Sequence, residues 1–155
     1  MDRVKLRFEH VGVSVRDLDV SRAWYEKVFD ARFDREEYME PLNCRIVHMY
    51  AEGGVHFELF RYLGEDRKDT PRDRYSSVLD LRTGGTKHTC FCLELPSFYR
   101  EKLLPNAVEI DHGPERMGNN WLMFIRDPDG ALYELWDVDG ALRDPHAFDG
   151  VPCVL

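Results

Sequence analysis

The segments EHVGVSV (residues 9–15) and KHTCFCL (residues 87–93) are the part of the sequence that decides the fold. Each alternates side chains in the manner of a β-strand, and each has a histidine in second place. The segments VHFELF (55–60) and ALYELW (131–136) match one another as well, because both end in Glu-Leu-aromatic. Histidine and glutamate are 48 residues apart in the first half, His10 to Glu58, and 46 apart in the second, His88 to Glu134. The chain therefore contains two similar modules.

Periodicity and turn residues predict the same order of elements, βαβββ, in each module. The first helix is expected to begin at Asp17 or Asp19, which can cap it, and to end near residue 30. Its apolar residues Val20, Trp24 and Val28 predict a buried stripe, with Trp24 packed under the first sheet. Strands are expected at residues 8–15, 31–39, 44–51 and 55–62 in module one. In module two we expect strands at 88–95, 108–112, 121–125 and 131–138, and a helix at 97–104 that Ser97 can cap.

The two modules are predicted to form one domain, residues 1–155. Module one covers about residues 5–63 and module two residues 86–139. The charged segment 64–85 contains Pro71 and is predicted to be a linker. Residues 140–155 are predicted to form a C-terminal tail.

Composition excludes several classes of protein. The 21 basic and 29 acidic residues give a net charge of −8, which disfavours binding to nucleic acid. No apolar run has the length of about 18 residues that a membrane-spanning helix needs. Four cysteines in a chain of 155 residues do not predict a disulfide scaffold. We therefore expect a cytoplasmic globular protein that binds neither nucleic acid nor membrane.

Strand alternation predicts which side chains share a face. In residues 55–62, Phe57 and Leu59 form an apolar face that can pack against the helix, and Tyr133 and Leu135 do so in residues 131–138. The opposite faces carry one histidine and one glutamate in each module: His10, Glu58, His88 and Glu134. If the two sheets curl toward each other, these four side chains converge in a cleft.

Imidazole and carboxylate groups together suit a divalent transition metal. A single histidine or glutamate on a strand is more often solvated or locally hydrogen-bonded than a ligand. However, burial of two unpaired carboxylates is costly, and a cation between them removes that cost. The occurrence of both residue types at matching places in two repeats favours the metal site.

Four stretches of the sequence resemble the vicinal oxygen chelate superfamily: HVGVSVRDLDVSRAWYEKVF (10–29), HFELF (56–60), GGTKHTCF (84–91) and RDPDGALYELWD (126–137). The superfamily includes glyoxalase I, methylmalonyl-CoA epimerase, extradiol dioxygenases and the fosfomycin and bleomycin resistance proteins. The resemblance implies an α+β fold in which two βαβββ modules form a U-shaped, curved mixed sheet around a metal cleft. It also implies that a Zn, Ni, Co, Mn or Fe ion is bound by His10, Glu58, His88 and Glu134.

The function implied by the resemblance is that of a glyoxalase-like lyase or an epimerase-like isomerase. Such an enzyme removes a proton next to a metal-chelated carbonyl of a small oxygenated substrate, with Glu134 as the base and Glu58 as its partner. A metal-dependent dioxygenase is an alternative, although a fourth carboxylate ligand counts against it. A non-catalytic small-molecule binding or resistance protein is another, although all four ligand positions are occupied. The resemblance further implies a homodimer.

Other residues near these positions have both a functional and a structural interpretation. His56 shares the face of Glu58, so it can be a further ligand, a hydrogen-bond donor to a ligand, a general base, or a buried histidine without a catalytic role. Phe60, Arg116 and Trp136 are candidates for contact with the substrate or for structural roles. His48 and His112 have no matching partner in the other module and are expected to be surface or core residues.

Overall fold

Each half of the chain folds as a βαβββ module, which confirms the α+β class predicted from the repeat. The computed structural model describes residues 7–68 and 84–154. It divides into two compact units, Met1–Arg67 and Lys68–Leu155, and each unit contains one four-stranded mixed sheet. Most of the predicted linker, residues 69–83, lies outside the described residues.

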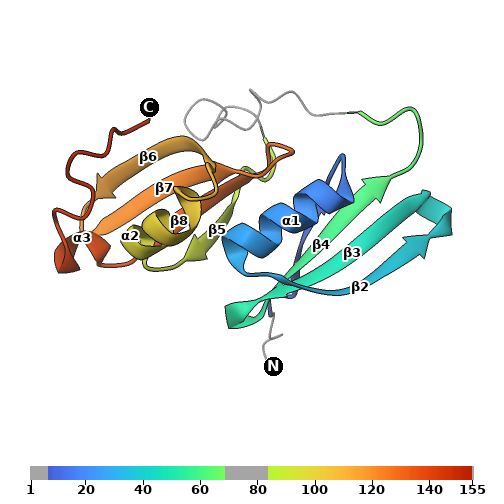
Figure 1. Cartoon of the computed structure of the whole chain (residues 1–155), viewed down its shortest axis with the longest axis horizontal. Coiled ribbons are helices and arrows are strands. Elements are labelled where there is room, and N and C mark those ends of the chain that lie inside the picture. Colours follow the sequence, from blue (N-terminus) through green and yellow to red (C-terminus); the bar gives the residue numbers. More distant parts are fainter. Residues whose placement is uncertain (1–6, 69–83, 155) are drawn as a thin grey trace, which may run out of the picture. The chain divides into compact units, whose positions relative to one another are not determined.

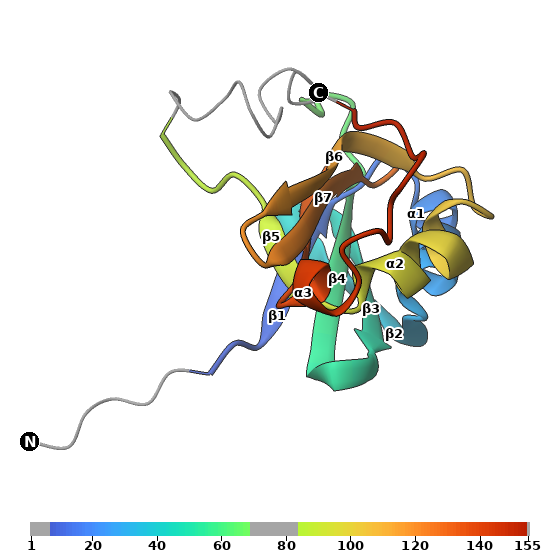
Figure 2. The ribbon, with the colours of Figure 1, turned by 90° about the vertical axis from the view of Figure 1, so that its left-hand side faces the viewer.

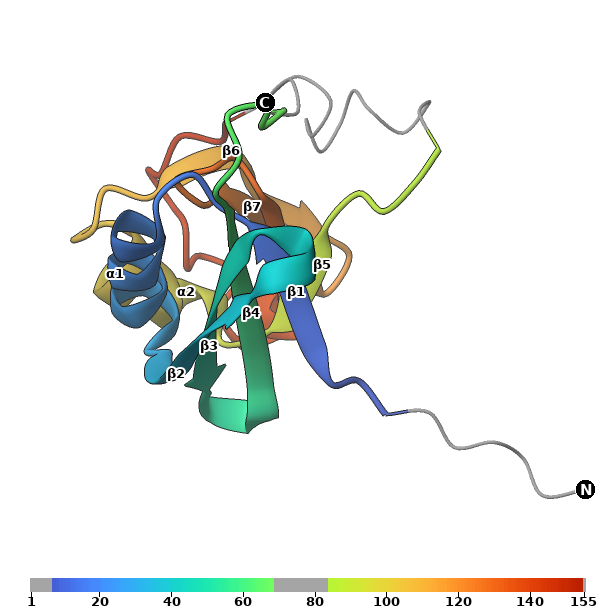
Figure 3. The same cartoon turned by 90° about the vertical axis from the view of Figure 1, so that its right-hand side faces the viewer.

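Module one contains one sheet with the strand order β1-β4-β3-β2, covered on one face by helix α1 (Figures 1 and 3). β1 pairs in parallel with β4, and the other pairs are antiparallel. A short turn at Glu52–Gly54 connects β3 to β4, as the sequence predicts. The elements are β1 His10–Ser14, α1 Leu18–Phe29, β2 Arg32–Met39, β3 Cys44–Ala51 and β4 Val55–Tyr62.

Module two repeats this arrangement with the strand order β5-β8-β7-β6 (Figure 2). β5 pairs in parallel with β8, as β1 does with β4. A π-helical segment, Tyr99–Leu103, continues the short helix α2. The elements are β5 Thr89–Cys92, α2 Leu95–Phe98, β6 Glu109–Met117, β7 Asn120–Arg126, β8 Leu132–Asp137 and α3 Gly140–Arg143.

Several boundaries in module two differ from the prediction, and β5 ends at Cys92 rather than at residue 95. β6 continues to Met117 rather than ending at 112, since its pairing with β7 resumes after an irregularity between His112 and Glu115. Gly113, with φ of 94°, interrupts the alternation there, so the pattern of side chains hides the second half of the strand. The helix begins at Leu95 rather than at residue 97, because Pro96 occupies its first turn. Its N-cap residue is therefore Glu94 and not the predicted Ser97.

Helix α1 begins where the sequence predicts, but it buries a different stripe. Asp17 caps it by accepting hydrogen bonds from the backbone N–H groups of Asp19, at 2.9 Å, and Val20, at 3.1 Å. The expected stripe of Val20, Trp24 and Val28 is wrong at its first two positions, because Val20 is 55% exposed and Trp24 only half-buried. Steps of four residues drift around a helix with 3.6 residues per turn. Steps of three and four stay on one face, and the buried residues are Leu18, Ser21, Tyr25 and Val28.

The core of each module lies between the helix and the apolar face of the last strand. In module one, the Tyr25 ring lies 4.9 Å and the Phe29 ring 5.5 Å from the Phe57 ring, measured between centroids. Phe57 and Leu59 are fully buried, as predicted from strand alternation. Tyr133 and Leu135 are buried in the same way in module two. The opposite faces of β4 and β8, which carry Glu58 and Glu134, are therefore not part of this core.

The segment after β8 packs against module two. The indole Nε1 of Trp121 donates a hydrogen bond to the carbonyl oxygen of Asp144 at 3.1 Å, and its ring contacts Phe148. Val154 pairs with Gly113 of β6. Among the residues that the structure describes, no helix has the length and apolar character required to cross a bilayer.

Tyr25→Ala should lower the free energy of unfolding by about 3–5 kcal/mol, because it leaves a cavity against Phe57. Val20→Ala, on the exposed side of the same helix, should change it by less than about 0.5 kcal/mol. Urea denaturation followed by circular dichroism measures both values. Equal losses for the two variants would contradict this assignment of the buried stripe.

Candidate metal centre

The first His–Glu pair joins the two parallel strands of module one. His10 begins β1, and Glu58 of β4 lies opposite Gly12, two residues further along β1. The pair is close, with His10 Nε2 3.5 Å from Glu58 Oε2. The His10 side chain is 43% exposed and that of Glu58 is 18% exposed, so the pair lies at the edge of a partly buried face.

The second pair has the same register in module two. His88 directly precedes β5, and Glu134 of β8 lies opposite Cys90, again two residues after the histidine. His88 Nε2 is 2.9 Å from Glu134 Oε2. The repeat seen in the sequence is thus also a repeat in geometry. Within each module, the structure brings together the two residues that the sequence pairs.

Strand β3 adds a third polar side chain to the pair in module one. His48 lies directly opposite Glu58 in the antiparallel pairing of β3 with β4. Its Nδ1 is 3.5 Å from Glu58 Oε1 and 3.1 Å from His56 Nε2. His48 and His56 are only 3% and 4% exposed. His48, expected to be a surface or core residue, is therefore a buried member of the Glu58 cluster.

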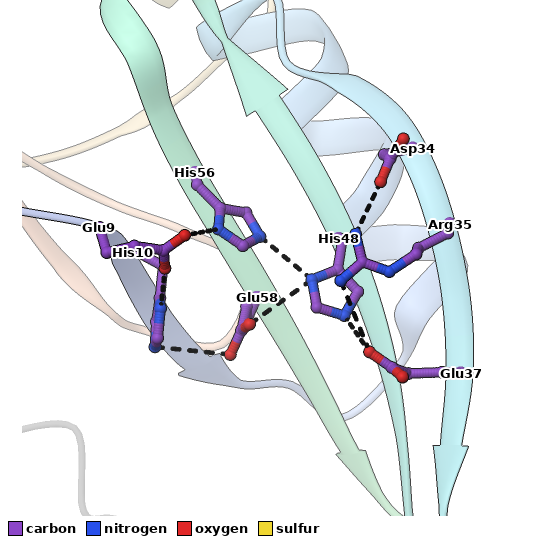
Figure 4. A network of polar contacts seen from close by, with 8 residues as sticks. All are labelled: Glu9, His10, Asp34, Arg35, Glu37, His48, His56 and Glu58. Atoms are coloured by element: carbon purple, nitrogen blue, oxygen red, sulfur yellow. Dashed lines mark hydrogen bonds and ion pairs between the residues drawn. The ribbon is translucent and has the colours of Figure 1, made fainter.

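These side chains form a closed ring of polar contacts, shown in Figure 4. From Glu58 the ring runs through His48 to His56, whose Nδ1 lies 3.5 Å from Glu9 Oε1. Glu9 contacts Nδ1 of His10, which returns to Glu58. The Glu9 carboxylate holds the pKa of His10 above its ordinary value, and the same contact lowers the pKa of Glu9. A sheet face of module one thus carries five linked acidic and imidazole groups.

A second carboxylate orients His48 from outside this ring. Nε2 of His48 lies 2.6 Å from Glu37 Oε1 on the neighbouring strand β2. Arg35 lies 3.7 Å from the same carboxylate and also pairs with Asp34 (Figure 4). The ring nitrogen of His48 that faces Glu37 is well placed to carry its proton, which leaves Nδ1 unprotonated on the side of Glu58 and His56.

The three remaining predicted residues lie in different surroundings. Phe60 and Trp136 are half-buried and follow Glu58 and Glu134 by two residues, so each shares the face of its glutamate. Phe60 covers Gly12, where an added Cβ would be 3.0 Å from the phenyl ring. Arg116 pairs with Trp121, which pairs with Asp137, so it lies on the opposite face from Glu134. Its Nε donates a hydrogen bond to the Gly118 carbonyl oxygen at 3.0 Å.

The donor atoms present fit a divalent transition metal. Two groups of three residues bring one donor atom each within 4.8 Å of one another: Glu9, His10 and His56, and His48, His56 and Glu58. Imidazole nitrogen and carboxylate oxygen bind Zn, Fe, Co, Ni and Mn ions. The Nδ1 atom of His56 is buried and lies 3.5 Å from Glu9 Oε1, but it makes no hydrogen bond with the described residues.

Cys90 faces Glu134 in the sheet and provides a probe of that carboxylate. Burial, and next the charge of Glu134, raise the pKa of the Cys90 thiol to about 12. Only the thiolate reacts with alkylating agents. In metal-free protein at pH 8, iodoacetamide should therefore label Cys90 at least about 100-fold more slowly than free cysteine, whose pKa is about 8.5.

Mass spectrometry of the labelled peptide measures this rate. Glu134→Gln should accelerate the labelling of Cys90, because it removes the negative charge that opposes the thiolate. Glu101→Gln, at an exposed position of the same module, is the matched control and should leave the rate unchanged. A rate equal to that of free cysteine would show that the thiol is neither desolvated nor close to a carboxylate.

Comparison with known proteins identifies relatives over most of the chain. Residues 7–135 match the family described as the Glyoxalase/Bleomycin resistance protein/Dioxygenase superfamily. The uncharacterized protein YqjC of Bacillus subtilis is 27% identical over 144 residues, which cover 90% of this chain and 98% of YqjC.

Solved structures share the fold at lower sequence identity. A glyoxylase/bleomycin resistance protein/dioxygenase domain from Frankia sp. EAN1pec is 19% identical, with a TM-score of 0.69, over 87% of this chain and 93% of that one. Glyoxalase I from Zea mays is 21% identical, with a TM-score of 0.62, over 84% of this chain and 44% of that one. The fosfomycin resistance protein FosX from Listeria monocytogenes, in complex with Mn(II) and sulfate, is 14% identical, with a TM-score of 0.57, over 87% and 93% of the two chains.

Proposed function

Since this chain belongs to the Glyoxalase/Bleomycin resistance protein/Dioxygenase superfamily, we propose that it is a metal-dependent lyase or isomerase. Its substrate is a small oxygenated molecule with an acidic C–H next to a carbonyl. The observation that carries the proposal is the pair of His–Glu contacts with the same register in both modules. The proposed ligands of one divalent ion are still the four predicted residues His10, Glu58, His88 and Glu134.

The proposed chemistry divides between the ion and the protein. When bound, a divalent ion polarises a substrate carbonyl and makes the neighbouring C–H more acidic. Glu134 is the proposed base, as the family resemblance implies. Its side chain is 15% exposed, so a substrate can reach a carboxylate that is partly shielded from water. His88 holds this carboxylate in place through a contact of 2.9 Å.

Glu58 is the proposed partner of Glu134 in proton transfer. It occupies the same register position in module one and contacts two histidines, His10 and His48. Two carboxylates that exchange a proton with one carbon atom from different sides allow isomerisation or epimerisation. Phe60 and Trp136 share the faces of these glutamates and are the proposed apolar walls for the substrate.

Replacement of any one of His10, Glu58, His88 or Glu134 by alanine should weaken metal binding and leave the fold intact. Each side chain supplies a donor atom from a sheet face that is not part of the core under the helix. Isothermal titration with Zn²⁺ or Mn²⁺ measures the affinity, and circular dichroism checks the fold. Unchanged affinity in all four variants would reject these residues as ligands.

Glu134→Gln should reduce turnover by roughly 10²–10⁴-fold and affect metal binding much less, because glutamine keeps a metal-binding oxygen but cannot accept the proton. A panel of 2-oxo and 2-hydroxy compounds in D₂O, followed by NMR, detects exchange of the acidic C–H. Glu101→Gln is the control and should exchange at the unmodified rate.

Oxygen consumption and ligand binding, measured with the same compounds, distinguish the alternative functions. Oxygen consumption coupled to turnover by iron-loaded protein would replace this proposal with a dioxygenase. Tight binding of a small molecule without exchange or turnover would indicate a binding or resistance protein. A homodimer in the cytoplasm also stays a prediction, and light scattering of the purified protein tests the dimer.

A further inference from the structure

The two modules differ at two positions on the face that carries the glutamate. In module one, His48 lies opposite Glu58, and His56 precedes Glu58 by two residues. The corresponding residues of module two are apolar, since Phe124 lies opposite Glu134 and Leu132 precedes it by two. The βαβββ fold is therefore formed with apolar residues at both places. The two buried histidines of module one need a reason other than folding.

The inner nitrogens of these histidines face one another across a short gap. His48 Nδ1 and His56 Nε2 are 3.1 Å apart, and Glu58 Oε1 lies 3.5 Å from the first of them. One donor atom from each of the three residues lies within 4.8 Å of the other two. Adjacent ligands held about 2.0–2.1 Å from one ion are about 3.3–3.4 Å apart in a tetrahedral site and about 2.8–3.0 Å apart in an octahedral site. The distances of 3.1 and 3.5 Å from His48 Nδ1 to the other two atoms are close to this spacing.

The outer nitrogens of both rings face carboxylates. His48 Nε2 lies 2.6 Å from Glu37, and His56 Nδ1 lies 3.5 Å from Glu9. A histidine that binds a metal usually directs its other ring nitrogen at a carboxylate, which fixes the proton there. With the protons on the outer nitrogens, the two inner nitrogens and Glu58 present only lone pairs to one another. A buried arrangement of this kind is unfavourable without a cation.

We propose that His48 Nδ1, His56 Nε2 and Glu58 Oε1 form a second site for a divalent transition metal, contained entirely in module one. Two imidazoles and one carboxylate are a known ligand set for such ions, with coordination positions left open. Glu58 is shared with the site proposed above, because its other oxygen faces His10. The second site does not depend on the proposed enzymatic activity, nor on His88 or Glu134.

The test begins with a variant that lacks the module-two ligands, His88→Ala with Glu134→Ala. Protein is equilibrated with Co²⁺ or Zn²⁺ and desalted, and the bound metal is counted by mass spectrometry. One ion per chain should remain, and Co²⁺ should give a visible absorption spectrum with nitrogen ligands. The further changes His48→Phe and His56→Leu should abolish both. They install the residues that module two carries at the same positions, and circular dichroism verifies the fold.

Two controls distinguish this site from its neighbours. Glu37→Gln should weaken binding by about 10–100-fold, because it removes the group that orients His48. His10→Ala should leave this ion in place, whereas its loss would assign the ion to Glu9, His10 and His56 instead and overturn the proposal. In unmodified protein, the ring protons of His48 and His56 should broaden in NMR spectra on addition of Co²⁺.

The outcomes separate this proposal from the proposed function. If unmodified protein binds one ion and the module-two variant binds none, the second site is refuted while the first stands. If the module-two variant keeps its ion but unmodified protein has no turnover on any substrate, the second site stands and the enzymatic proposal fails. An unchanged NMR spectrum of His48 and His56 with excess Co²⁺ would also overturn the second site.

Discussion

The parallel pairing of the first and last strands in each module is the constraint on which the site depends. A parallel pair requires a long connection, and the helix and two strands between β1 and β4 provide it. The pairing brings residues 48 positions apart in sequence, His10 and Glu58, to within 3.5 Å. It also places Gly12 opposite Glu58, and Cys90 opposite Glu134 in module two. Both are small residues, so the glutamate can reach across to the histidine.

The order of elements within each module could be predicted from the sequence because the information for it is local. Alternating side chains and the Glu-Gly-Gly turn predict β3 and β4 at their observed residues, and Asp17 predicts the start of α1. The errors occurred where local patterns are ambiguous. An apolar residue every fourth position suggested the wrong side of α1, and Gly113 concealed the second half of β6. In each case the tertiary partner, not the local pattern, determines the outcome.

The candidate site was less predictable, although one further signal was present in the sequence. A hairpin that turns at residues 52–54 pairs residue 51 with 55, and therefore 48 with 58. That register predicts that His48 lies opposite Glu58. A comparison of the two modules does not reveal His48, however, because module two has Phe124 at the matching position. The contacts of Glu9 and Glu37 with the histidines depend on side-chain conformation and on the bulge in β2 at Phe33 and Arg35. No periodicity in the sequence encodes these contacts.

The charges on the two glutamate faces are unequal, and this inequality has a chemical consequence. Module two places one carboxylate, Glu134, beside His88 and apolar neighbours. Module one links Glu9, Glu37 and Glu58 through three histidines, two of them almost fully buried. With neutral imidazoles, Arg35 is the one cation among the residues of this network, and it lies beside Glu37. The two buried imidazoles and the partly buried Glu58 carboxylate are stabilised by positive charge between them, from protons or from a metal ion. A metal ion satisfies the inner lone pairs and leaves the outer nitrogens protonated toward their carboxylates, whereas an extra proton can satisfy only one inner contact.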